Sequence, residues 1–279
     1  MNIFNIIKKF YFEIILLIIL VIMFQSYWPI WFSGWSDIES PYAFAFFVFA
    51  FIVYFIKINY VNLANVPKNP SNKGILLVLS GLFFYVVGLR ADINYMVSLS
   101  LPVLVGGIIF TLYGTELFKK LLKPLILLTF TFPIFPIHRI TIPLQGLSAH
   151  LTSDFLNFLG VNSFCEGSIV NVEHYKLSVV AGCSGLRSLI TLFFTSIIFT
   201  YFIKADKLKK TLFVLFTIPL SIIMNVSRIS LVGFYAIYNG YGGLEKFHND
   251  LGIVTSIISM SILVIIAKFI DNDGGKNEA

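Results

Sequence analysis

Three residue types that together could perform acyl transfer occur in the second half of the chain. Cys183 lies in Ala181-Gly182-Cys183-Ser184-Gly185, Arg228 ends Asn225-Val226-Ser227-Arg228, and His248 lies in Phe247-His248-Asn249. A thiol nucleophile needs a base or a cationic partner to form the thiolate, and the attacked carbonyl needs a donor for its developing oxyanion. Histidine and arginine supply those two functions, so all three are candidate catalytic residues.

Each of the three also has a structural interpretation. Cys183 could be a buried structural cysteine, although its small neighbours would let a substrate backbone approach and a helix starting beside it would favour the thiolate. Arg228 could be an interfacial arginine that extends to the lipid headgroups. His248 could be an ordinary loop histidine, because three others share its side of the predicted topology: His138, His150 and His174.

The composition is that of an integral membrane protein. Hydrophobic residues make up 57% of the 279-residue chain and charged residues 12%, with a mean hydropathy of +0.88. Soluble chains carry roughly a quarter charged residues. The net charge of +6 is not accompanied by a basic groove or a stacking platform, so we expect no nucleic-acid partner. Basic islands between membrane spans explain this charge better.

Apolar runs of roughly 17 to 25 residues predict spanning helices. We therefore expect an all-α fold, a single polytopic membrane domain over residues 1–279 with about eight transmembrane helices and a catalytic core at about 130–270. The first run follows Lys8 and Lys9 without a small-residue cleavage site, which indicates an uncleaved helix. The predicted spans are 10–27, 41–57, 74–90, 96–114, 122–137, 184–203, 211–228 and 251–269.

The basic residues predict the orientation. Most of the 20 lysines and arginines lie in islands on the same side as the N-terminus. The positive-inside rule assigns that side to the cytoplasm, so both termini are expected there. The long loops at 138–183 and about 229–250 then lie outside. The first should contain an interfacial helix, Ile142 to Leu159 with Gly160 as its stop, and a β-hairpin over Ser168–Val180 with its tip at Glu173–Lys176.

This topology brings the candidate residues to the outer face of the cytoplasmic membrane. Cys183 stands at the outer start of span 184–203, Arg228 near the outer end of the next span, and His248 just before the last span. Three signals that are weak singly therefore converge on one extracytoplasmic site.

The order and spacing of these blocks resemble those of the exosortase/archaeosortase family of multi-spanning membrane proteins. The motifs cover about residues 130–250, and the eight-span architecture extends the resemblance to most of the chain. The matching blocks are Phe132-Pro133-Ile134-Phe135-Pro136, Pro143-Leu144-Gln145, Cys183-Ser184-Gly185-Leu186-Arg187, Asn225-Val226-Ser227-Arg228 and His248.

The resemblance implies a cysteine protease or transpeptidase. Such enzymes are expected to act on secreted proteins that end in a short motif, a transmembrane helix and a basic tail. They cleave near the motif and transfer the new C-terminus to an acceptor, whose identity stays open. The implied catalytic trio is Cys183 as the thioester-forming nucleophile, His248 as proton carrier and Arg228 as oxyanion donor. Supporting roles are expected for Ser184, Arg187 and Asn225, the last two as further donors. Membrane lipids are the remaining expected partners.

A competing interpretation rests on Cys165, the only other cysteine. Two cysteines in an oxidising compartment often pair, and a Cys165–Cys183 disulfide would leave a non-catalytic scaffold for envelope polymer assembly or export. A transporter would need ionisable groups and helix breaks near mid-membrane, which the spans mostly lack. No paired Cys or His spacing predicts a metal site, and no glycine-rich phosphate loop occurs, so no cofactor is expected.

Overall fold

A computed structural model describes residues 3–37, 40–134, 138–179 and 181–275 of the chain. Phe135 and Pro136 of the proline-rich block and Val180 at the end of the predicted hairpin lie outside the described residues. The chain divides into two compact units, Met1–Phe135 and Pro136–Ala279. Each unit has its own hydrophobic core.

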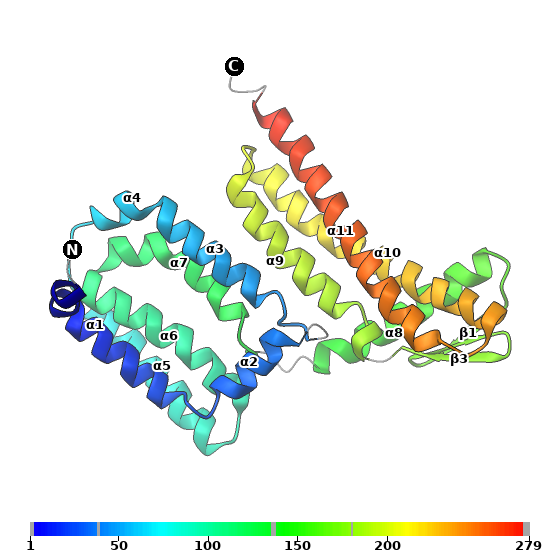
Figure 1. Ribbon diagram of the computed structural model, residues 1–279, viewed down its shortest axis with the longest axis horizontal. Coiled ribbons are helices and arrows are strands. Elements are labelled where there is room, and N and C mark those ends of the chain that lie inside the picture. The colour runs from blue at the N-terminus through cyan, green and yellow to red at the C-terminus, as the bar shows by residue number, and fades with distance from the viewer. Residues whose placement is uncertain (1–2, 38–39, 135–137, 180, 276–279) are drawn as a thin grey trace. The chain divides into compact units, whose positions relative to one another are not determined.

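The first unit is built from helices (Figure 1, blue to green). Its helices α5 and α6 pack closely because small residues face the contact: a Cβ atom at Gly107 would lie 2.7 Å from the backbone nitrogen of Val78. Buried Trp31 donates its Nε1–H to Ser98 Oγ at 3.0 Å and so ties α2 to α6. The helices are α1 (Ile3–Met23), α2 (Trp28–Ser36), α3 (Ala45–Ile58), α4 (Tyr60–Ala64), α5 (Lys73–Arg90), α6 (Asn94–Tyr113) and α7 (Thr115–Phe130).

The second unit combines helices with a small sheet (Figure 1, green to red). Helices α9, α10 and α11 pack against one another, while α8 packs against α10 and the sheet. The elements are α8 (His138–Phe158), β1 (Ser163–Glu166), β2 (Ile169–Val172), β3 (Tyr175–Ser178), the 3-10 turn η1 (Ala181–Cys183), α9 (Leu186–Phe202), α10 (Lys207–Asn239) and α11 (Leu244–Gly275).

The sheet contains the predicted hairpin and one strand more. β2 and β3 pair antiparallel with Val172 opposite Tyr175, so the turn is tighter than predicted and consists of Glu173 and His174. β1 pairs antiparallel with the other edge of β2, and Gly167 closes that turn at φ +63°. The sequence did not predict β1, because Ser163–Glu166 contains none of the β-branched residues that indicated the hairpin.

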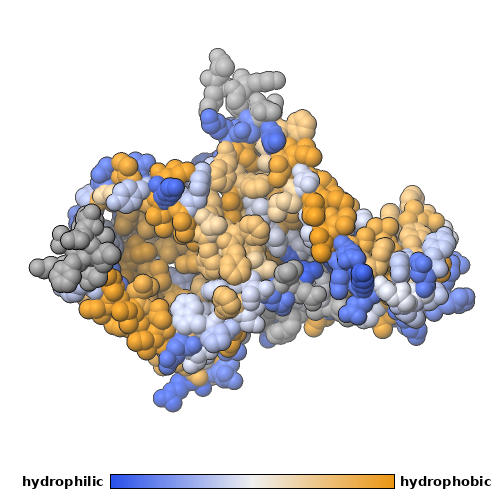
Figure 2. All heavy atoms as spheres, in the orientation of Figure 1, coloured by the Kyte–Doolittle hydropathy of each residue, from blue (hydrophilic) through white to orange (hydrophobic). Residues whose placement is uncertain are grey.

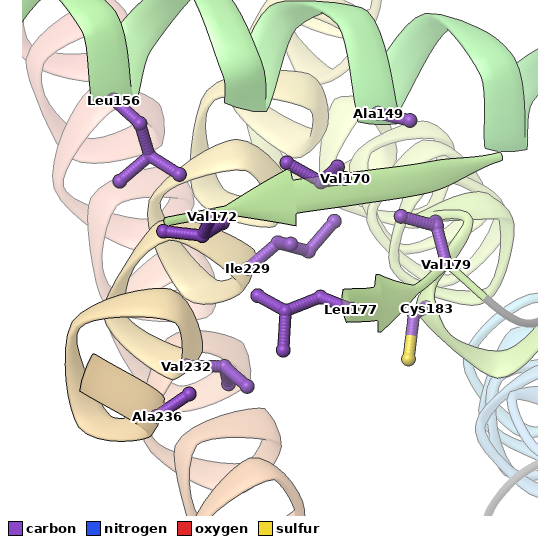
Figure 3. Packing of buried hydrophobic residues seen from close by; sticks show 10 residues of the cluster. All are labelled: Ala149, Leu156, Val170, Val172, Leu177, Val179, Cys183, Ile229, Val232 and Ala236. Carbon is purple, nitrogen blue, oxygen red and sulfur yellow. The ribbon is translucent and has the colours of Figure 1, made fainter. Parts of the chain in front are cut away.

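The core of the second unit lies between one face of this sheet and the helices α8 and α10 (Figure 3). Antiparallel partners point to the same face, so alternate residues of β2 and β3 reach the core together. Cys183 lies at the margin of this core, just beyond β3. The buried members are Ala149, Leu156, Val170, Val172, Leu177, Val179, Cys183, Ile229, Val232 and Ala236.

The chain is a membrane protein, but the described helices support fewer spans than predicted. Four helices are long and apolar enough to cross a bilayer: Lys73–Arg90, Asn94–Tyr113, Lys207–Asn239 and Leu244–Asp271. Tyr11–Met23 and Trp28–Ser36 would form a fifth span only as one pair, bent by 84°. Ala45–Ile58 and Leu186–Phe202 are apolar but shorter. The count of eight therefore stays a prediction.

Several helix boundaries differ from the predicted ones, and two of these differences have a clear physical cause. α7 ends at Phe130 rather than at residue 137, because Pro133 follows and disfavours helical geometry in the residue before it. α10 continues past Arg228 to Asn239, so most of the expected loop at 229–250 is helical. The extra turns are held by burial of Ile229, Val232 and Ala236 against the sheet.

Apolar side chains cover much of the visible surface over the helices of each unit (Figure 2, orange). Leu76 of α5 is 74% exposed and Phe269 of α11 is 72% exposed. Exposed apolar residues at this density on long helices match a lipid solvent rather than water.

Candidate functional site

The candidate nucleophile lies in a short turn between the sheet and α9. β3 is followed by the 3-10 turn η1, which ends at Cys183, and α9 begins at Leu186. Gly185 joins them with φ +78°, a conformation that favours glycine. The backbone N–H of Leu186 donates to Ser184 Oγ at 3.3 Å, so Ser184 satisfies one of the free N–H groups at the start of α9. This turn fixes Cys183 at the helix start, as the sequence predicted.

Cys183 is paired with His248. Its Sγ lies 2.8 Å from His248 Nε2, and 8% of the cysteine is exposed. His248 stands in the second turn of α11, where the preceding residue Phe247 stacks on Tyr235 of α10 with 4.3 Å between the ring centroids. His248 Nδ1 lies 3.3 Å from Asn249 Oδ1, so a hydrogen on Nδ1 would leave Nε2 free to accept the thiol proton.

Arg228 is buried beside this pair. It is 3% exposed, and its Nη2 donates to Asn225 Oδ1 at 2.8 Å and to the Gly182 carbonyl at 3.5 Å. Its positive charge is close enough to Cys183 to stabilise a thiolate there. Nη1 faces α11, where a Cβ at Gly252 would lie 3.6 Å away, and Nε has no hydrogen-bond partner among the described residues. The guanidinium therefore keeps donor capacity next to the thiol.

Asn225 links the other parts of the site. Its Nδ2 donates to the Cys183 carbonyl at 2.9 Å and to Ser148 Oγ at 3.0 Å, while its Oδ1 accepts from Arg228. Ser148 in turn donates to the Ser184 carbonyl at 3.2 Å. Both amide hydrogens of Asn225 are thus donated within the protein, so Asn225 bridges the nucleophile turn, α8 and Arg228.

Ser148 is the residue that sequence reasoning missed. It lies on α8, in the stretch predicted as an interfacial helix, and is 5% exposed. A serine on such a helix carries no signal of its own. Only the close packing of α8 on α10 brings it to Asn225.

The remaining candidates lie around this centre. Arg187 follows Cys183 by one helical turn, is partly exposed, and its charge repels that of Arg228. His174 lies in the turn between β2 and β3, and His150 is exposed on α8. The geometry therefore selects His248 among the histidines whose side chains are described.

The disulfide of the competing interpretation is not formed between Cys165 and Cys183. Cys165 Sγ donates to the Gly167 carbonyl at 3.3 Å. Burial and the carboxylate of Asp154 raise the pKa of Cys165 above its ordinary value. Among the described residues, no group of three or more His, Cys, Asp or Glu side chains could hold a metal ion.

Comparison with known proteins identifies a family. The model of the family described as transmembrane exosortase (Exosortase_EpsH) matches residues 31–265, which include the turn at Cys183 and the helices α8 to α11 up to residue 265. No curated protein and no solved structure was found to match the chain.

Proposed function

Because the chain belongs to the transmembrane exosortase family, we propose that it is a membrane cysteine transpeptidase or protease that cleaves C-terminal sorting signals of secreted proteins. The observation that carries the proposal is the 2.8 Å contact between Cys183 Sγ and His248 Nε2. It joins a nucleophile directly to a base, the first requirement of thiol catalysis.

The first step forms the thioester. His248 Nε2 accepts the thiol proton, and the thiolate of Cys183 attacks the carbonyl carbon beside the sorting motif. Arg228 donates to the resulting oxyanion, since it retains hydrogen-bonding capacity next to the sulfur and carries a permanent charge. When the C–N bond breaks, His248 returns its proton to the leaving amine, and the substrate remains bound as an acyl group on Sγ.

The second step releases the acyl group. An acceptor nucleophile, or water, attacks the thioester while His248 Nε2 takes up its proton. The C–S bond then breaks, and the proton passes to the sulfur. Transfer and hydrolysis therefore use the same residues and differ only in the nucleophile that reaches the thioester.

The proposed sidedness rests on charge distribution. Lysine-rich islands flank the ends of the apolar helices that lie opposite Cys183 in the predicted topology, and such islands stay in the cytoplasm. We therefore propose a cytoplasmic-membrane location with both termini inside and the site of Cys183 outside. The proposed substrates are secreted proteins that carry a C-terminal motif, a transmembrane helix and a basic tail.

The test compares the two cysteines in cells that produce the chain. C-terminal peptides of secreted proteins are measured by mass spectrometry in cells with the unaltered chain, Cys183→Ala or Cys165→Ser. We expect Cys183→Ala to leave the C-terminal tails intact at unchanged protein level, and Cys165→Ser to process them normally. Continued processing by Cys183→Ala would refute the proposal.

A further inference from the structure

The two outer edges of the small sheet differ. On β1, the side chain of Asn157 from α8 covers the edge: its Nδ2 donates to the Ser163 carbonyl at 2.8 Å, and its Oδ1 accepts from the Ser163 N–H at 2.9 Å. A capped edge cannot pair with another strand at that residue. The β1 edge is therefore closed at its first residue by the protein itself.

The outer edge of β3 is largely open. In an antiparallel pair, successive residues direct their backbone groups alternately to the partner strand and away from it. Val179 donates its N–H to the Ser168 carbonyl at 2.8 Å, on the β2 side, so Leu177 also faces β2 while Lys176 and Ser178 face outward. The Lys176 N–H donates to the Tyr241 hydroxyl at 3.0 Å. Within the described part of the chain, the N–H and C=O of Ser178 and the C=O of Lys176 have no partner.

This open edge leads directly to the nucleophile. β3 ends at Ser178, and η1 then carries the chain to Cys183. In Figure 3 the strand points toward Cys183, which lies just beyond its end. Cys183 is the fifth residue after Ser178, so their Cα atoms are at most about 18 Å apart. An acetylated, extended peptide of four residues already spans about 17 Å, so it could pair with β3 at Ser178 and still present a carbonyl to the sulfur.

The side chains along the edge leave it accessible. Lys176 and Ser178 are exposed, whereas Leu177, on the opposite face, is buried against Gly233 of α10. The strand β3 is thus held in place by the buried side chain of Leu177, while the side chains of Lys176 and Ser178 leave its outer edge accessible.

We propose that the outer edge of β3, at Ser178 and the Lys176 carbonyl, binds an extended segment of substrate polypeptide as an added strand and guides it to Cys183. This inference rests on the proposed function. Main-chain hydrogen bonds would supply affinity with little dependence on side-chain identity, as in other cases of strand addition to a sheet edge. Sequence selection would then come from groups nearer the scissile bond.

The test uses peptide probes that alkylate a cysteine. The full-length protein with Cys165→Ser, purified in detergent, reacts with iodoacetamide, acetyl-Ala-chloromethyl ketone or acetyl-(Ala)4-chloromethyl ketone. Two further acetyl-(Ala)4-chloromethyl ketones each carry a single N-methyl group. The methylated residue in one probe is the neighbour of the methylated residue in the other. We expect the tetrapeptide to alkylate Cys183 at least about tenfold faster than the single-residue probe, and only one N-methyl isomer to lose that advantage, because alternate residues face β3.

A matched pair of variants examines the edge itself. Ser178→Pro removes the outward N–H and leaves the β2 side of the ladder intact, whereas Ser178→Ala keeps the N–H. We expect Ser178→Pro to lose the tetrapeptide advantage by about tenfold with an unchanged iodoacetamide rate, and Ser178→Ala to keep it. If Ser178→Pro disturbs folding, the rate of reaction with iodoacetamide changes. The two N-methyl isomers, tested on the protein that carries only Cys165→Ser, then decide whether the peptide adds to β3 as a strand.

The outcomes separate this inference from the proposed function. Rapid iodoacetamide labelling of Cys183 with no tetrapeptide advantage, or equal rates for the two N-methyl isomers, would overturn strand addition and leave the thiol chemistry intact. If Cys183 reacts no faster than an ordinary thiol with iodoacetamide, the proposed function itself fails.

Discussion

The two cysteines lie in one compact unit and neither forms a disulfide, yet their surroundings have opposite effects on the thiol. Cys165 faces a carbonyl oxygen and the negative charge of Asp154, both of which favour the neutral thiol. Cys183 faces a histidine nitrogen and a buried guanidinium. Under the proposed function, the neighbours supplied by α10 and α11, and not the residue type, distinguish the nucleophile from the other thiol.

Removing His248, the proposed base, should have the largest effect on the activity of Cys183. His248→Ala leaves Cys183 without the acceptor at 2.8 Å and the leaving amine without a proton donor. We expect processing of C-terminal tails to fall on the order of 10³-fold, measured as the processed fraction over time. His174→Ala, in the turn of the sheet, is the matched control and should process normally. Equal processing by both variants would contradict the role of His248.

Replacing the guanidinium of Arg228 by an amine of the same charge should have the next largest effect on processing. Arg228→Lys cannot reproduce a guanidinium that reaches both Asn225 and the turn at Gly182. We expect processing to fall on the order of 10²-fold, since one oxyanion donor is lost. Arg139→Lys, on an exposed position of α8, serves as control. Full activity of Arg228→Lys would show that charge alone suffices.

Backbone strain in the turn that joins Cys183 to α9 should have a smaller effect, and it should act on stability. In Gly185→Ala, a side chain is forced into φ +78° with its Cβ 3.0 Å from Asn225 Cγ. We expect a loss of about 1–3 kcal/mol in the free energy of unfolding, seen as a lower melting temperature in detergent. Gly182→Ala is the control, because nothing lies within 4 Å of its Cβ. Equal melting temperatures of the two variants would mean that the turn is not fixed as described.

The smallest expected effect is on the rate of alkylation of Cys165. Asp154→Asn removes a negative charge that raises the pKa of Cys165, so the folded pKa should fall and thiolate should form at lower pH. In a Cys183→Ala background we expect alkylation of Cys165 at pH 8 to rise a few-fold. An unchanged rate would indicate that burial alone raises this pKa.

Much of this site could be predicted from sequence because its chemistry depends on uncommon residue types. A cysteine among small residues and an arginine inside an apolar run have few structural explanations. The family motifs then singled out one histidine among four. The hairpin between β2 and β3 was predicted as well, from its β-branched residues.

The remainder depended on packing that no local pattern encodes. Ser148 became part of the site only because α8 packs on α10. The continuation of α10 to Asn239 follows from burial of Ile229, Val232 and Ala236 on a sheet that forms elsewhere in the chain. The span limits could not be predicted either, because an apolar run does not reveal the 84° angle between the helices Tyr11–Met23 and Trp28–Ser36.

The most direct measurement is the pH dependence of alkylation of each cysteine alone. Full-length protein with Cys165→Ser or with Cys183→Ala reacts with iodoacetamide between about pH 5 and pH 10. The proposed site predicts that Cys183 reacts at clearly lower pH than Cys165, because burial and the charge of Asp154 raise the pKa of Cys165 above its ordinary value. Superimposable profiles for the two cysteines would contradict the assignment of Cys183 as the nucleophile.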